Sequence, residues 1–176
     1  MNLESMAIEL PAFHGHPNRE PFHGVLTLVD TPSDKAPAGS RGHRVVLTRA
    51  AAERALPSLL GMALDYSPSL DRHDSRRKVG VITRAEIVGK TIELGGYLFA
   101  KDFPEIVRQI ETGSIHASAG ARRRPANPLG MSYEISDASV ADVRARIWTL
   151  TRVTFTGAAI LRRDKAAYRS TWIEME

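Results

Sequence analysis

The chain of 176 residues is long enough for one domain with a sizeable hydrophobic core, and its 43% hydrophobic and 25% charged residues are typical of a soluble globular protein. It has no cysteine, which excludes disulfides, thiol nucleophiles and thiolate metal sites, and it has no apolar run long enough to span a membrane. The formal net charge is +4, from 24 basic and 20 acidic residues, so the surface carries both signs and nucleic-acid binding is not expected.

The N-terminal part of the sequence predicts an arm followed by two strands. Residues 1–22 are proline-rich and are predicted to form an irregular arm, with residues 23–176 as a single domain. The segment HGVLTLVD, which begins at His23, alternates like a β-strand. Residues 31–42, TPSDKAPAGSRG, have the composition of a loop, and residues 43–48, HRVVLT, are predicted as the second strand.

A short helix and a hairpin are predicted next. Thr48 can cap a helix formed by RAAAERAL, a run of good helix formers that Pro57 should end or kink. The segments KVGVITRAEI (78–87) and TIELGGYLFA (91–100) have strand-like patterns. Residues 88–90 contain a glycine and join the two segments as a hairpin.

A second helix is predicted after the hairpin. Asp102 is placed to cap it, and Glu105, three positions later, is the expected capping-box partner. Apolar residues at helical spacing follow, and Gly113 is predicted to end the helix.

Three strand candidates complete the chain, at 114–121, 130–136 and 143–161. The last is long enough to be two strands that meet near Leu150. Strands outnumber helices and hairpin links dominate, which favours antiparallel pairing over a doubly wound parallel sheet. The predicted fold class is therefore α+β: a strand-rich, mostly antiparallel barrel or sheet with flanking helices.

Two short segments carry residue types suited to nucleophilic chemistry. In IHASAG, residues 115–120, a strand would point His116 and Ser118 to the same face, and the small neighbours would let a substrate approach the serine. A serine hydroxyl needs a base within hydrogen-bond reach. His73, in LDRHDS, is better placed for this role than His116, because flanking aspartates such as Asp74 can orient or charge its ring.

Three segments of the chain, in the same order, resemble the phage prohead (capsid maturation) protease family, whose fold is distantly related to the herpesvirus assembly proteases. They are LDRHD followed by KVGVITRAEI, then KTIELGGYLFAKDFPEIVRQIETGSIHASAG, and finally IWTLTRVTFTGAAILRRDKAAY. The resemblance extends from about Leu47 to Tyr168 and depends on the order and spacing of short motifs. It implies a serine endopeptidase that cleaves scaffold or capsid protein during phage head assembly.

Carried onto this sequence, the resemblance makes His73 the general base and Ser118 the nucleophile. Ser132, in LGMSYEIS, also resembles the serine strand of the family and is the alternative nucleophile. The family's strand glutamate is replaced here by Arg152, which cannot accept a hydrogen bond from an imidazole. The candidates for the third member are His116, Asp74 and Glu134.

The missing glutamate supports a second hypothesis, in which the chain keeps the protease fold without the activity and is a structural component of the phage head or connector. Under both hypotheses the expected partners are capsid or scaffold protein and further copies of the chain, in the host cytoplasm, procapsid or virion. No cofactor or metal is expected, because the His-x-His of residues 14–16 lies in a proline-rich arm without a carboxylate pattern. Residues 122–124, three arginines after Ser118, are interpreted as a solvated loop in preference to an oxyanion-stabilising group.

Overall fold

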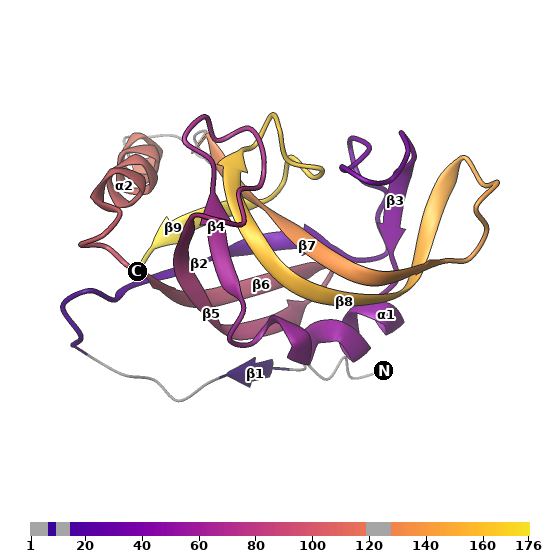
Figure 1. Ribbon diagram of the computed structural model, residues 1–176, viewed down its shortest axis with the longest axis horizontal. Helices are drawn as coiled ribbons and strands as arrows, with labels where there is room; N and C mark the ends of the chain where they lie inside the picture. The colour runs from indigo at the N-terminus through magenta and orange to yellow at the C-terminus, as the bar shows by residue number, and fades with distance from the viewer. Residues whose placement is uncertain (1–6, 10–14, 119–127) are drawn as a thin grey trace.

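The structure is a computed structural model that describes residues 7–9, 15–118 and 128–176 (Figure 1). Strands dominate the described residues, which also form two α-helices and one 3-10 helix. The elements in chain order are β1 (Ala7–Glu9), β2 (Glu20–Leu28), β3 (Arg44–Leu47), α1 (Arg49–Ala55), the 3-10 helix (Leu56–Leu59), β4 (Ala63–Tyr66), β5 (Lys78–Val88), β6 (Thr91–Leu98), α2 (Pro104–Ser118), β7 (Leu129–Val140), β8 (Ile147–Arg162) and β9 (Trp172–Met175).

The strands form one mixed sheet, with the order β3-β8-β4-β5-β6-β2-β9 along its main path. β7 pairs with β8, and β1 pairs with β5. Two pairings, β3 with β8 and β4 with β8, are parallel, and the other pairings among the described strands are antiparallel. The predicted α+β class with mostly antiparallel strands is confirmed.

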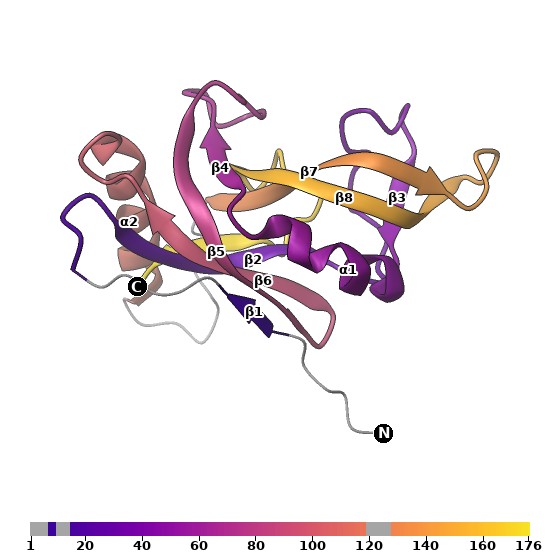
Figure 2. The ribbon, with the colours of Figure 1, turned by 60° about the horizontal axis from the view of Figure 1, so that its bottom comes forward.

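β7 and β8 form a long curved two-stranded ribbon (Figures 1 and 2). In both views α2 lies at one end of the molecule and β3 lies at the other. β8 uses two different partners along its other edge: Ile147–Leu150 pairs with β3, and Ala158–Ile160 pairs with β4. The prediction that 143–161 forms two strands meeting near Leu150 is therefore wrong, because one strand changes partner and does not break.

One hydrophobic core lies on one face of this sheet. The alternation of strand side chains sends Leu64, Tyr66, Ala158 and Ile160 into it, whereas Ala159 belongs to a separate small cluster on the opposite face. α1 and the 3-10 helix contribute further buried leucines and alanines to the core. The opposite face of β4, β7 and β8 carries polar side chains, among them Asp65 and Ser132, beside this small cluster.

Several local predictions are confirmed. Thr48 is the N-cap of α1, and its hydroxyl accepts a hydrogen bond from the backbone N–H of Ala51. β5 and β6 form the predicted hairpin. In the predicted arm, residues 7–9 are a strand, and β2 begins at Glu20, earlier than the alternation from His23 indicated.

The predictions for residues 102–121 need correction. α2 continues past Gly113 to Ser118, so the expected strand at 114–121 is wrong. Gly113 is buried and continues the stripe of Ile106 and Ile110 at helical spacing, so it lies on the packed face of the helix and does not end it. The Asp102 carboxylate accepts a hydrogen bond from Asn18, and the Glu105 carboxylate accepts one from Tyr66. Both of the side chains predicted to cap the helix therefore bind partners outside it. Among the described residues, no helix is long and apolar enough to cross a membrane.

Candidate functional site

Three ionisable side chains from different parts of the sheet meet on the face opposite the core. They are Asp65 of β4, His73 of the β4–β5 loop and Glu134 of β7, and one N or O atom of each lies within 4.8 Å of the others. Asp65 is fully buried, whereas the side chains of His73 and Glu134 are 30% and 22% exposed. The cluster is therefore partly accessible to solvent.

The pairing of β8 with two neighbours brings these residues together. Ala159 of β8 is the register partner of Asp65 on β4 and also of Ser132 on β7. Paired residues on adjacent strands point to the same face, so Asp65 and Ser132 project from the same side of the sheet. Glu134 follows Ser132 by two positions and shares that face.

Small residues on β8 give the Glu134 carboxylate its space. Glu134 is paired with Gly157, and a Cβ atom added at Gly157 would lie 2.9 Å from Oε2 of Glu134. The carboxylate therefore occupies the space above Gly157, between β7 and the neighbouring β4. A larger residue at this position would push it away from His73.

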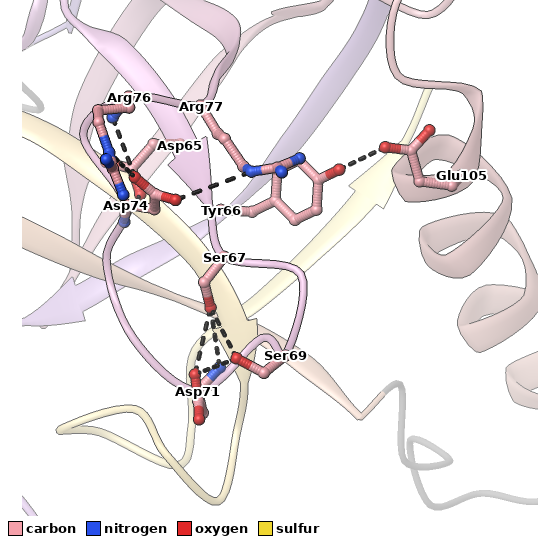
Figure 3. A network of polar contacts seen from close by, with 9 residues as sticks. All are labelled: Asp65, Tyr66, Ser67, Ser69, Asp71, Asp74, Arg76, Arg77 and Glu105. Carbon is pink, nitrogen blue, oxygen red and sulfur yellow. Dashed lines mark hydrogen bonds and ion pairs between the residues drawn. The ribbon is translucent and has the colours of Figure 1, made fainter.

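Polar contacts at both ends of the β4–β5 loop hold the segment that carries His73 (Figure 3). At the first end, the hydroxyl groups of Ser67 and Ser69 donate to Asp71, and the bond from Ser69 contributes most to lowering the pKa of that carboxyl. At the other end, the Asp74 carboxylate forms ion pairs with Arg76 and Arg77, at 3.6 and 3.8 Å.

The backbone of the same loop is also tied to the buried aspartate. The N–H of Asp74 donates to Oδ1 of Asp65 at 3.0 Å. His73, between the two anchored ends of the loop, is thus fixed next to β4.

His73 and Glu134 are joined by a hydrogen bond of 3.0 Å between Nδ1 and Oε1. An ionised carboxylate can only accept, so Nδ1 carries the proton and donates it to Glu134. In the neutral ring, the other nitrogen, Nε2, then has its lone pair available to accept a proton. This is the tautomer that a histidine general base requires.

Asp65 is the most perturbed acid of the cluster. Burial, above all, raises the pKa of its carboxyl to about 6 from an ordinary 3.8, and the neighbouring Glu134 carboxylate adds to the increase. The hydrogen bond from Asp74 opposes this shift and does not cancel it. The second oxygen of Asp65, Oδ2, is buried and receives no hydrogen bond from the described residues.

A cavity of about 870 Å³ opens beside the cluster, and His73, Ser132 and Glu134 all line it together with Trp148 and Lys165. This volume is within the range of substrate pockets. Among the residues that the structure describes, no hydrogen bond joins the Ser132 hydroxyl to the His73 ring. Ser132 and His73 thus share one cavity without direct contact.

The remaining predicted site residues have different positions. Ser118 and His116 belong to α2, their side chains lie outside the described residues, and the pairing of His73 with Ser118 stays a prediction. The same-face argument for these two residues depended on a strand and does not apply. Residues 122–124 also lie outside the described part of the chain. Arg152 is exposed on β8 opposite Ser139, five positions along β7 from Glu134.

Of the two candidates for a third member whose side chains the structure describes, Glu134 contacts His73, and Asp74 forms ion pairs with Arg76 and Arg77. The side chain of His116 lies outside the described residues.

Sequence analysis missed Asp65. The segment ALDY could have indicated it, because its one aspartate lies between Leu64 and Tyr66, which are both buried. A charged residue is unusual in such a buried strand.

Comparison with known proteins gives little further information. No protein-family model matches the sequence, and no curated protein matches it. Among solved structures, 12 chains match. One of them is Kaposi's sarcoma herpesvirus protease in complex with an allosteric inhibitor, with a TM-score of 0.41 and 12% sequence identity over 88% of this chain and 74% of that chain. Similarity at this level carries no argument about activity.

Proposed function

We propose that the chain is a serine endopeptidase in which Ser132 is the nucleophile, His73 the general base and Glu134 the carboxylate that orients the base. The hydrogen bond of 3.0 Å between His73 and Glu134 carries this proposal, because it selects the histidine tautomer that can deprotonate an alcohol. Ser132 supports it by its place in the same cavity and on the same face of β7 as Glu134.

The reaction follows from these positions. With a peptide in the cavity, Nε2 of His73 takes the proton of the Ser132 hydroxyl while Oγ attacks the scissile carbonyl carbon. Glu134 accepts the Nδ1 hydrogen bond and stabilises the imidazolium that forms. Nε2–H then protonates the leaving amine, and water, deprotonated by the same nitrogen, hydrolyses the acyl-enzyme.

The substrate we propose is the capsid or scaffold protein of a phage head. We further propose that the chain acts in the procapsid together with other copies of itself. The order of LDRHD, the serine strand and the closing strand in the sequence supports this choice. A cavity of about 870 Å³ has room for several residues of an extended peptide.

A fluorophosphonate probe tests the proposal without knowledge of the cleavage site, because it reacts with serines that a neighbouring base activates. We expect a single labelled peptide that contains Ser132, identified by mass spectrometry. The Ser118→Ala variant should be labelled at the wild-type rate, and the Ser132→Ala variant should carry no label. Labelling at Ser118 would transfer the role of nucleophile to the helix, against our proposal.

A second candidate function, a structural head protein with a protease fold, is favoured by the lack of a hydrogen bond between the Ser132 hydroxyl and the His73 ring among the described residues. If no serine of the folded chain reacts with the probe, the endopeptidase proposal fails and this second function becomes the one to test. The protein should then be found intact and in stoichiometric amounts in finished particles.

Gly157→Ala should reduce the labelling rate of Ser132 by about 10²-fold and lower the stability modestly. The new Cβ, 2.9 Å from Oε2, displaces the flexible Glu134 carboxylate, and it also lies 3.1 Å from the backbone oxygen of Ala63, which has to shift slightly. A misplacement of about 1 Å in a catalytic site reduces the rate by about this factor. Labelling rate and thermal unfolding are measured together.

Gly95→Ala is the matched control for this variant, because its Cβ also meets the end of a flexible side chain, Nε of Arg84 at 3.0 Å, away from the site. Equal labelling rates for the two variants would show that the position of Glu134 does not matter for reaction at Ser132.

A further inference from the structure

We propose that Asp65, His73 and Glu134 form a binding site for a transition-metal dication of the Zn²⁺ type. The three side chains come from β4, the β4–β5 loop and β7, and each offers one ligand atom within 4.8 Å of the other two. Metal binding here is a property of these side chains and is independent of Ser132.

The distance between Nδ1 of His73 and Oε1 of Glu134 agrees with the distance expected between two ligand atoms of one ion. Zn²⁺ lies about 2.0 to 2.2 Å from histidine nitrogens and carboxylate oxygens, so two such ligands at ordinary coordination angles are roughly 3 to 3.5 Å apart. Nδ1 of His73 and Oε1 of Glu134 are 3.0 Å apart. An ion bound by both atoms would lie to one side of the line that joins them, so the imidazole would rotate to direct its Nδ1 lone pair at the ion.

The buried oxygen of Asp65 is the second, independent observation. Asp65 is fully buried, and in its ionised form Oδ2 receives no hydrogen bond from any described residue, because the neighbouring Glu134 carboxylate can only accept. Oδ1 is already held by the N–H of Asp74, so the orientation of the carboxylate is fixed. A cation in the cluster would supply the missing partner.

The ligand set indicates the class of ion. One imidazole and two carboxylates suit Zn²⁺ and similar transition-metal ions, whereas Mg²⁺ prefers oxygen ligands alone. Three protein ligands leave a fourth position for water. His73 and Glu134 line the large cavity, which gives the ion a route from solvent.

Bound metal has a consequence for catalysis that rests on the proposed function. An ion on Nδ1 of His73 takes the lone pair of that nitrogen, so the proton of the neutral ring lies on Nε2. Nε2 then has no lone pair with which to accept the proton of the Ser132 hydroxyl. The metal should therefore inhibit the reaction of Ser132 with the fluorophosphonate probe, and EDTA should restore it.

Isothermal titration of Zn²⁺ into the Ser132→Ala protein tests the site without any need for activity. We expect one Zn²⁺ per chain, and no comparable heat from Mg²⁺. His73→Ala and Asp65→Asn should each weaken the affinity by at least about 100-fold, since even partners of the ligands contribute 10- to 100-fold. Circular dichroism verifies that each variant is folded.

His23 is the matched control, because it too lies near two carboxylates, Glu174 at 3.9 Å and Glu176 at 4.0 Å, on the exposed side of the sheet. His23→Gln should bind Zn²⁺ like the parent protein. The proposal is overturned if the folded chain binds no Zn²⁺, or if His23→Gln loses the binding and the two cluster variants keep it. Binding at the cluster with unchanged labelling of Ser132 would retain the metal site and remove its inhibitory role.

Discussion

Glu134→Gln is expected to reduce the rate at which a fluorophosphonate labels Ser132 by about 10⁴-fold, although the protein keeps its fold. A glutamine amide can donate to Nδ1 of His73, which places the ring proton on Nε2 and leaves no lone pair facing the serine. In Ser-His-Asp enzymes the equivalent carboxylate-to-amide change costs about this factor. The rate is measured under pseudo-first-order conditions by mass spectrometry of the intact chain.

Glu53→Gln on α1 provides the control for this substitution. Glu53 is exposed, and its ion pair is with Arg49, one helical turn away. Its labelling rate should equal that of the wild type. A loss of less than tenfold in Glu134→Gln would mean that Glu134 does not orient the base, and the assignment of the triad would fail.

The second large effect concerns stability. Asp65→Asn should stabilise the protein by about 3 kcal/mol at pH 8 and have little effect near pH 4. Burial raises the pKa of Asp65 to about 6 in the folded state from 3.8, and two pKa units correspond to about 3 kcal/mol. Because the folded state binds the proton more tightly than the unfolded state, stability is complete below about pH 4. It falls as the pH rises toward 6 and stays lower above that value.

Urea unfolding at pH 4 and pH 8, in the presence of EDTA, measures this difference. Asparagine keeps the acceptor for the Asp74 N–H and its amide can donate to Glu134, so it imitates the protonated acid. Asp142→Asn, at an exposed turn where the side chain accepts from the N–H of Arg144, should show no such pH dependence. If the difference in unfolding free energy between the wild type and Asp65→Asn were the same at pH 4 and pH 8, the raised pKa of Asp65 would be refuted.

Local sequence signals predicted much of the fold. The helix capped by Thr48 and the β5–β6 hairpin depend on interactions between residues close in sequence, and both are present. The predictions were wrong where tertiary contacts determine the secondary structure. Gly113 has a weak helix preference, which burial on the packed face of α2 outweighs, and β8 is continuous because β3 and β4 succeed one another along its edge.

The site was predicted in part. His73 and Glu134 were both candidates, but only the register of β7 against β8 brings the glutamate to the ring. Asp65 was missed because its burial depends on the parallel pairing of a four-residue strand with Ala158–Ile160, far along the chain, and no local pattern encodes that contact. The choice between Ser118 and Ser132 likewise depended on whether residues 114–121 were a strand or a helix.

The three residues of β1 cover part of one edge of the sheet. β4 pairs with β5 only along Lys78–Val81, which would leave the backbone groups of Arg84–Glu86 unpaired, and β1 covers that stretch. Uncovered strand edges are templates for intermolecular pairing and aggregation. β1 then forms the edge itself, and with three residues it is a short edge strand, which is one of the ways in which proteins limit such pairing. Release of Ala7–Glu9 would expose the backbone groups of the longer strand β5.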